Sequence, residues 1–361
     1  MFSLLKERID YFFGRGQHSI FVPVMDGALK PNEFLDQIKI IFEKKEVDNL
    51  LIAESEVLCS AGVELLLIKP SGKTKILHSF ECDITSLAYN NKSSELAIAL
   101  SEGRVIVCSL KPFKIKKEFK EDSVTSMMYH NEYLLYTKGS NKHLADNWKA
   151  DLMSLGKTGS VLLNSLDGNS SKILIDNLSW PSGIVMINET TFCVSEAWSH
   201  RISFFNFDRG SVSISRDSRV INKLPAYPGR LFYDSANNNL WVTFFAPRNQ
   251  LVEFILTEDE FRNRMVKEID PDLWAAPCLR SGKHISEPLQ QSGIKTMGYL
   301  KPWAPAFSYG LVVKFDIDLN AEASFHSRTN GGFHGTSSVV IDPKGHVLVT
   351  SKGDGKIGLW K

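Results

Sequence analysis

Short apolar runs alternate with turn residues along most of the chain, and this pattern predicts a protein built from β-strands. The stretch 178–205 shows the unit: a strand at 183–187, an Asn-Glu turn, a second strand at 191–195, and a wider loop before a third strand. Strand-like runs separated by turn residues at intervals of about 8–12 positions are typical of all-β sandwiches, barrels and propellers.

An internal repeat narrows the choice among these architectures. The run ITSLAY at 84–89 is echoed by VTSMMY at 124–129. A spacing of about 40 residues is the period of a four-stranded propeller blade. Six such sets follow one another, and the last has only three strands before Lys361. We therefore predict a six-bladed β-propeller over residues 46–361, with a strand at 37–42 in the extension 1–45 closing the ring.

The segment 246–308 is the one part of the predicted propeller that does not repeat. Thr257-x-x-Glu260 has the form of a capping box ahead of the run 260–269, which predicts a helix there. Several prolines follow, with Trp274 and Trp303 among them. A long irregular segment in a compact protein is usually functional, so we expect a rim insertion over blade five rather than a second domain.

The first thirteen residues predict a short amphipathic helix, because the apolar residues Phe2, Leu5, Ile9 and Phe12 lie three to four positions apart. Charged residues interrupt this run, which argues against a signal peptide. We expect the helix to dock on the body of the protein; peripheral contact with a membrane through residues 1–13 is the alternative. No stretch reaches the roughly 18 apolar residues of a transmembrane span.

Composition restricts the partners and the compartment. Lys and Arg number 42 against 41 Asp and Glu, a net charge of +1, so no overall field attracts nucleic acid and a small molecule is the expected partner. The five cysteines are odd in number, far apart and without a CxxC pair, which argues against zinc and favours a reducing compartment, the cytoplasm. A single disulfide is the alternative.

The stretch 178–202 resembles the central motif of strictosidine synthase-like proteins, which are related to the regucalcin/gluconolactonase and paraoxonase propellers. Segments 227–242 and 309–358 resemble two further motifs of that family, in the same order. The resemblance covers roughly residues 46–361. The residues of the central motif that match are Pro181, Gly183, Ile184, Val194, Ser195, Glu196, Arg201 and Ile202.

The resemblance implies a small-molecule enzyme that hydrolyses an ester or lactone, or carries out a metal-free condensation, at the mouth of the propeller channel. The alternative is a non-catalytic propeller that binds a small ligand or a protein partner. Strictosidine synthase condenses an amine with an aldehyde and uses a Glu on the inner strand of the last blade. Residues 334–340 contain no Glu, which argues against that reaction because acid/base catalysis needs a titratable group there.

The resemblance also implies where a metal would bind, because the calcium-dependent relatives hold the ion with oxygen ligands at the starts of the inner strands. Asp48 is a candidate ligand, or else a turn carboxylate. Ser182 replaces an Asn of the family pattern, and Gly229-Arg230 replaces Asp-Asn. A guanidinium repels a cation, so we predict no cofactor, with calcium at Asp48 as the alternative.

Two residues are candidates for acid/base catalysis. His334 precedes the last blade and titrates near neutral pH, unless it is a loop residue without a role. Glu196 ends a strand beside the channel mouth, and a structural pair with Arg201 is its other interpretation. The candidate substrate-binding residues are Arg230, Ser182, Trp180, Tyr227, His200 and Phe333.

Each of these binding candidates has a structural alternative. Arg230 either clamps an anionic substrate or pairs with Asp48 across the channel. The aromatic residues either line an apolar pocket or pack between blades, and His200 is otherwise a surface loop residue.

Overall fold

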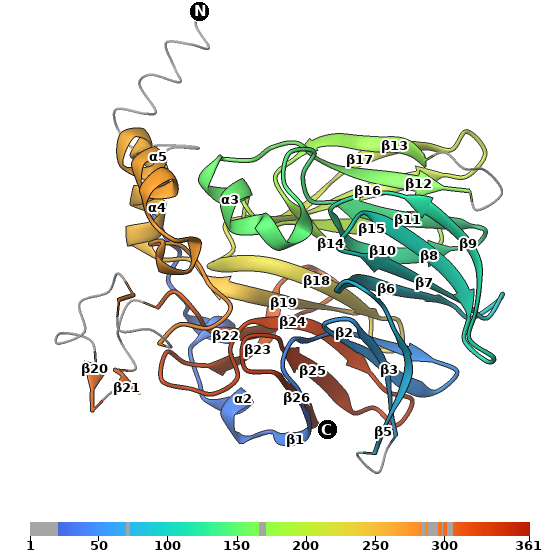
Figure 1. The fold of residues 1–361 in the computed structure, drawn as a ribbon, viewed down its shortest axis with the longest axis horizontal. Helices are drawn as coiled ribbons and strands as arrows, with labels where there is room; N and C mark the ends of the chain where they lie inside the picture. Colours follow the sequence, from blue (N-terminus) through green and yellow to red (C-terminus); the bar gives the residue numbers. More distant parts are fainter. Residues whose placement is uncertain are drawn as a thin grey trace, which may run out of the picture.

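Six four-stranded antiparallel sheets follow one another along the chain and form the blades of a β-propeller (Figure 1). The computed structural model describes residues 21–69, 73–165, 171–282, 286–287, 295–297, 299–301 and 306–361. The helix expected at residues 1–13 and the residue Trp303 lie outside these ranges. The predicted all-β, six-bladed fold is confirmed.

The first three blades use consecutive strands of the chain. Blade one contains β2 Val47–Ala53, β3 Glu56–Ala61, β4 Glu64–Ile68 and β5 Thr74–Ser79. Blade two contains β6 Ile84–Asn90, β7 Glu95–Leu100, β8 Arg104–Ser109 and β9 Lys114–Lys120. Blade three contains β10 Val124–His130, β11 Tyr133–Lys138, β12 Gly159–Asn164 and β13 Ser171–Leu178.

The last three blades include the insertion and the closure of the ring. Blade four contains β14 Pro181–Met186, β15 Thr191–Glu196, β16 Arg201–Asp208 and β17 Ser213–Ile221. Blade five contains β18 Ala226–Asp234, β19 Asn239–Pro247, β22 Gly310–Phe315 and β23 Ala321–Ser327. Blade six contains β24 Thr336–Ile341, β25 Val347–Ser351, β26 Lys356–Trp360 and β1 Lys39–Glu43.

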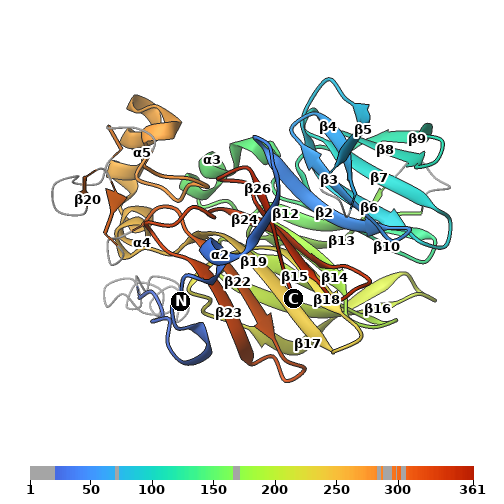
Figure 2. The same cartoon turned by 90° about the horizontal axis from the view of Figure 1, so that it is seen from below.

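The strand β1 closes the ring by pairing antiparallel with β26, so that Lys39 faces Leu359 and Glu43 faces Lys356 (Figure 2). The sequence placed this strand at 37–42. Residues 34–37 instead form the single helical turn α2 Phe34–Gln37, which follows the 3-10 turn η2 Gly27–Leu29. The strand from the N-terminal extension thus completes blade six, and segments from both ends of the chain share one sheet.

Apolar side chains fill the spaces between neighbouring blades. Leu58 and Leu65 of blade one, for example, pack in one cluster with Leu96 and Ile98 of blade two. Cys59, Cys82, Cys108 and Cys193 are free thiols. Burial raises the pKa of Cys59 to about 12, so this thiol acts as a small apolar side chain of the core.

The rim insertion after β19 contains the helices α4 Gln250–Thr257 and α5 Asp259–Glu268, the 3-10 turn η4 Pro271–Leu273, and the short strands β20 Lys295–Thr296 and β21 Tyr299–Leu300. The predicted helix is present as α5, but its capping box is not formed. Thr257 ends α4 and donates its hydroxyl to the carbonyl of Phe254, while Glu258 occupies the N-cap position of α5.

A second excursion, between β11 and β12, carries η3 Ala145–Asn147 and α3 Trp148–Met153. Figure 1 shows α3 between blade three and the insertion helices, so that both excursions lie at one side of the molecule. In the part of the chain that the structure describes, no helix is long and apolar enough to cross a membrane.

Candidate functional site

The six inner strands share a backbone irregularity at their first residues. In every one the pairing with the next strand shifts register near its beginning, as a β-bulge does. Bulges re-aim side chains and are enriched at barrel rims and near active sites. Six residues at or beside these bulges, one per blade, line a central cavity of about 150 Å³: Asp48, Thr85, Thr125, Ser182, Arg230 and Ser337. We call these six residues the floor ring.

Hydroxyl groups of the floor ring connect neighbouring blades. Thr125 Oγ1 donates to the carbonyl oxygen of Pro181 at 2.5 Å. Ser182 Oγ donates in the same way to the carbonyl oxygen of Pro228 at 2.6 Å. Each bond runs from the start of one inner strand to the start of the next, so these side chains fix the spacing of the blades around the axis.

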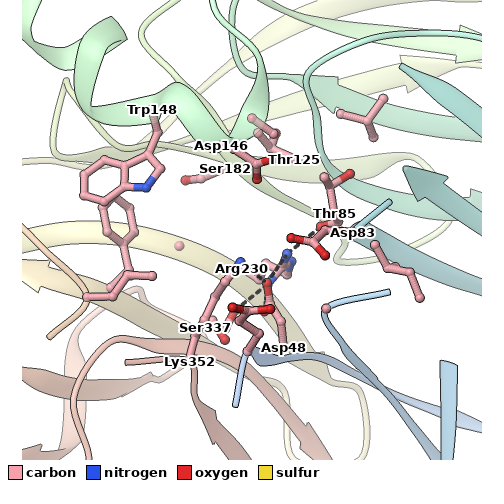
Figure 3. A pocket seen from close by; sticks show the side chains of 18 of the residues that line it. Asp48, Asp83, Thr85, Thr125, Asp146, Trp148, Ser182, Arg230, Ser337 and Lys352 are labelled. Carbon is pink, nitrogen blue, oxygen red and sulfur yellow. Dashed lines mark hydrogen bonds and ion pairs between the residues drawn. The ribbon is translucent and has the colours of Figure 1, made fainter. Parts of the chain in front are cut away.

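Arg230 crosses the channel and binds oxygen atoms of three other blades (Figure 3). Its Nη1 donates to Asp48 Oδ1 at 2.6 Å and to the Ser337 carbonyl at 3.1 Å. Its Nη2 donates to the Thr85 carbonyl at 2.7 Å and to Asp48 Oδ2 at 3.4 Å. Both Nη atoms therefore donate their hydrogens to groups of the protein. Two roles were predicted for Arg230, and the structure shows the pair with Asp48.

A second cation completes this cluster. Lys352, in the loop after β25, donates from Nζ to Asp48 Oδ2 at 2.9 Å and keeps 35% of its side chain exposed. Burial of Asp48 on its own raises the pKa of its carboxyl, but the charges of Arg230 and Lys352 outweigh this effect and hold the pKa well below its usual range. One buried carboxylate is thus shared by two cations, which leaves a net positive charge under the cavity.

Three more carboxylates line the cavity above the floor ring: Glu46, Asp83 and Asp146. Glu46 pairs with Lys45 at 3.0 Å, whereas neither Asp83 nor Asp146 has an ion pair with any described residue. Burial, followed by the charges of Glu46 and Asp146, raises the pKa of Asp83. Asp83 therefore accepts a proton more readily than an ordinary aspartate carboxylate does.

An aromatic wall bounds another side of the cavity and consists of Trp148, Trp180 and Phe245. Trp180 has a φ of +52°, a left-handed conformation that costs a bulky residue about 1–3 kcal/mol. Its ring stacks on Trp198 with the centroids 5.4 Å apart. This packing holds the strained residue in place and presents one face of the wall to the cavity.

The cavity opens into a larger vestibule of about 1020 Å³ beneath the rim insertion. Both spaces are lined by Glu46, Asp146, Trp148, Leu279 and Lys352. These five residues form the border that a molecule passes when it moves from the vestibule to the floor ring.

Of the site residues predicted from the sequence, the structure brings Asp48, Ser182, Trp180 and Arg230 together around the cavity. The other predicted residues do not line it. Glu196, His334, Tyr227 and Phe333 are buried and His200 is partly buried, and each makes contacts that account for its position.

Glu196 is 1% exposed and forms a bidentate pair with Arg201, at 2.7 Å to Nε and 3.0 Å to Nη2. It also accepts hydrogen bonds from Ser203 Oγ at 3.2 Å and from the backbone N–H of Ser179 at 3.3 Å. This is the structural alternative that the sequence offered for Glu196.

His334 is fully buried beside blade six. Its Nε2 lies 2.7 Å from the Arg328 carbonyl and its Nδ1 lies 2.8 Å from Ser308 Oγ. Because a carbonyl only accepts, Nε2 carries the proton and Nδ1 accepts from Ser308. Burial, and then the charge of Arg280, lower the pKa of His334 to about 4, so the ring is neutral at pH 7 and is held by structural bonds.

The remaining predicted residues pack below the insertion and in blade six. Tyr227 belongs to the apolar cluster under α4 and α5, and the ring of His200 lies 4.9 Å from it. His200 is therefore not the surface residue of the alternative interpretation; its Nε2 lies 3.7 Å from Glu253. Phe333 packs against Leu35 in another cluster.

Sequence reasoning missed Asp83, Asp146, Trp148, Leu279 and Lys352. Asp83 had a usable signal, because it directly precedes β6 just as Glu46 directly precedes β2. Asp146 and Trp148 lie in the excursion that carries η3 and α3, and Leu279 lies in the rim insertion, so no repeat pattern marks them as facing the channel. Lys352 lies in the turn between β25 and β26, where strand periodicity does not apply.

A calcium ion, which the family resemblance implies as an alternative, does not fit these residues. Asp48 is already shared by Arg230 and Lys352, and the Arg230 guanidinium binds the oxygen atoms that face the axis. Among the described residues no cluster of three or more His, Cys, Asp or Glu side chains can hold a metal ion. Hard cations require several such oxygen ligands.

Comparison with known proteins supports the fold. No protein-family model and no curated protein matches the chain. Among solved structures, a gluconolactonase from Xanthomonas campestris is similar over 94% of both chains, with a TM-score of 0.56 and 13% identity. A luciferin-regenerating enzyme is similar over 88% of this chain and 92% of that chain, with a TM-score of 0.54 and 10% identity. The chain therefore has the fold of gluconolactonase-like β-propellers.

Proposed function

We propose that the protein is a small-molecule enzyme that hydrolyses a lactone or ester in the central cavity without a bound divalent cation. The observation that carries the proposal is the pairing of a fixed positive cluster, Arg230–Asp48–Lys352, with the proton-accepting carboxylate of Asp83 in one cavity. The similar propellers named as a gluconolactonase and a luciferin-regenerating enzyme support a small-molecule reaction on this fold.

Lys352 and Asp83 supply the chemistry that hydrolysis needs. Asp83 takes a proton from a water molecule, and the resulting hydroxyl adds to the carbonyl carbon of the substrate. Lys352 uses one of its three N–H donors on Asp48, so the others can stabilise the oxyanion of the tetrahedral intermediate. The carbon–oxygen bond of the ester or lactone then breaks, and the departing alkoxide takes the proton from Asp83.

Arg230 acts at longer range in this scheme. The hydrogens of its Nη atoms are engaged by Asp48, Thr85 and Ser337, so these two atoms contribute charge and not a direct hydrogen bond to the substrate. A fixed cation in a partly enclosed cavity stabilises developing negative charge more than the same cation in water does. The free cysteines are compatible with action in a reducing compartment such as the cytoplasm.

The test is hydrolysis of a panel of γ- and δ-lactones and p-nitrophenyl esters, with a chelator and with added calcium. We expect the same rate in both conditions. Asp83→Asn should lower kcat/KM by roughly 100-fold, within the usual range for loss of a general base. Lys352→Met should lower it by a similar factor. The control Asp208→Asn, which changes an exposed carboxylate at the end of β16, should leave the rate unchanged.

A wild-type protein inactive on the whole panel, or an Asp83→Asn variant with full activity, would overturn the proposal. One observation favours the second candidate function, a propeller that binds a ligand without catalysis. Both catalytic residues predicted from the sequence, Glu196 and His334, are occupied by structural hydrogen bonds. Under that alternative, panel compounds would raise the melting temperature of the protein and remain intact.

A further inference from the structure

A short segment of the rim insertion, residues 278–281, crosses the border between the vestibule and the cavity; we call it the roof strap. Leu279 lies on this strap and lines both spaces. Among the described residues of the insertion, it is the one that reaches the central cavity. Trp148, from α3, lies on the same border.

Hydrogen bonds fix both ends of the roof strap. The backbone N–H of Cys278 donates to the Phe307 carbonyl at 2.9 Å. At the other end, the backbone N–H of Ser281 donates to Ser308 Oγ at 2.8 Å, and the two serine hydroxyls lie 2.8 Å apart. Leu279 is thus held between two anchored residues and has little freedom to withdraw.

The strap is also bound to blade six. Arg280 pairs with Asp354 at 3.2 Å and donates to the Gly331 carbonyl at 2.9 Å. Ser308, which anchors Ser281, is itself bonded to His334. His334 is therefore a positioning residue for the strap: its ring holds the serine that holds the strap in place.

Two glycines let the strap approach the mouth of the propeller. A Cβ atom at Gly353 would lie 2.1 Å from the Leu279 carbonyl oxygen, and one at Gly335 would lie 2.8 Å from it. Contacts this short are excluded, so any side chain at Gly353 would force Leu279 outward. The backbone of blade six and the strap thus fit together only because these positions have no side chain.

We infer that Leu279 determines the size of the substrate group that enters the central cavity. The cavity on the inner side of Leu279 measures about 150 Å³, a volume known in another protein to hold a benzene-sized molecule. The vestibule on its outer side is much larger. The inference rests on the proposed function: the enzyme accepts a small acyl group or lactone ring, and Leu279 excludes longer acyl chains from the floor ring.

The experiment compares Leu279→Ala with Leu273→Ala, a matched control whose leucine lines the vestibule and not the cavity. Both variants and the wild type are assayed on p-nitrophenyl esters from acetate to octanoate. Leu279→Ala should raise kcat/KM for octanoate relative to acetate by about tenfold, as expected when a few methylene groups gain space. Leu273→Ala should keep the wild-type profile.

A second readout does not depend on catalysis. Trp180 lines the cavity and is buried, so removal of the Leu279 side chain should increase quenching of its fluorescence by acrylamide about twofold. The increase should disappear in the double variant Leu279→Ala/Trp180→Phe and should be absent from Leu273→Ala.

The two readouts separate failure of the inference from failure of the proposed function. Unchanged quenching in Leu279→Ala, or an ester profile identical to that of the wild type, would overturn the role of Leu279. Increased quenching together with no hydrolysis by any variant would confirm the aperture and overturn the enzymatic function that gives it a substrate. Increased quenching with the expected shift in chain length would support both.

Discussion

The floor and the roof of the central cavity are built from different kinds of sequence. The floor ring takes one residue from the start of each inner strand, so its six positions follow the repeat of the propeller. The roof comes from two excursions outside the repeat, the loop that carries Trp148 and the roof strap that carries Leu279. The strands of the blades fix the positions of the floor residues, whereas a few hydrogen bonds and ion pairs fix the position of the roof.

This difference separates stability from specificity. The floor contains the buried ion pair of Asp48 and Arg230, and substitutions there should lower the free energy of unfolding of the whole protein. The roof strap is anchored by hydrogen bonds at its ends, and changes at Leu279 should alter what enters the cavity while the propeller stays folded. The following four predictions test this division, beginning with the largest effect.

Replacement of Asp48 should cause the largest loss of stability. Asp48→Asn leaves the cations of Arg230 and Lys352 facing a neutral amide, and breaking a buried ion pair costs about 3–5 kcal/mol. The free energy of unfolding, measured with denaturant, should fall by that amount. The double variant Asp48→Leu/Arg230→Met should recover most of it, because neither charge is then left alone.

The control for this prediction is Asp217→Asn, which removes an ion pair with Arg219 at the surface and should change stability by less than about 1 kcal/mol. Equal effects of Asp48→Asn and Asp217→Asn would show that the floor cluster does not hold the blades together.

Acidification should loosen the roof strap before the floor. Burial lowers the pKa of His334 to about 4 from its ordinary value of 6.5. When the roof strap detaches and His334 is exposed to water, the ring binds a proton more readily than it does in the closed structure. The stabilisation of the closed strap is therefore lost as pH falls from about 6.5 to about 4. The loss approaches about 1.4 kcal/mol per pH unit. The charged neighbours that modulate it are Arg280, Asp354 and Asp36.

Asp48 responds to acidification in the same direction as His334, but in a lower pH range. Its pKa is held below the ordinary value of 3.8, so its contribution is present above that pH and is lost only below it. Hydrogen exchange at pH 5 should therefore be faster than at pH 7 for the amides of Cys278 and Ser281, after correction for intrinsic rates, and unchanged in β2. His334→Gln should abolish the pH effect, and simultaneous opening of β2 would contradict the division.

Glu196→Gln should give a smaller loss of stability and no loss of chemistry. Glu196 accepts bonds from Arg201, Ser203 and Ser179, and hydrogen bonds to charged groups contribute about 1.5–3 kcal/mol. Denaturant unfolding should show a loss of about 2 kcal/mol. The rate of ester hydrolysis per folded molecule should stay within about twofold of wild type, as it should for the exposed control Glu189→Gln. A variant of full stability without activity would restore Glu196 as a catalytic residue.

Ser182→Ala should give the smallest effect. The change removes one hydroxyl of the floor ring and leaves the Pro228 carbonyl without its donor, at a cost of about 1 kcal/mol. Denaturant unfolding is again the measurement, with the exposed Ser218→Ala as control. If the two variants are equally stable, the hydroxyl groups do not contribute to the spacing of the blades.

The same division explains how far the sequence could predict the site. The repeat predicted the six blades and the closing strand. The family resemblance pointed to Asp48, Ser182 and Arg230, which the structure places at the starts of three inner strands. The same strand position in β6, β10 and β24 would have pointed to Thr85, Thr125 and Ser337.

The roof could not be predicted in this way. Trp148 and Leu279 reach the cavity from the two excursions, whose paths depend on long-range contacts such as the fit of Leu279 against Gly353. His334 and Glu196 were predicted to face the channel, but they do not. Both have suitable chemistry and lie at or near the ends of blade strands, yet their hydrogen-bond partners hold the side chains in the protein interior. Residue type and strand position alone do not specify that direction.

The Arg230 guanidinium binds Asp48 at the axis of the propeller, and we propose that no divalent cation binds there. The most direct measurement is thermal unfolding of the wild-type protein with excess calcium and with a chelator. The account predicts the same midpoint in both conditions. A midpoint raised by calcium would contradict it, since an ion bound only by the folded state at 100 times its Kd adds about 2.7 kcal/mol of stability.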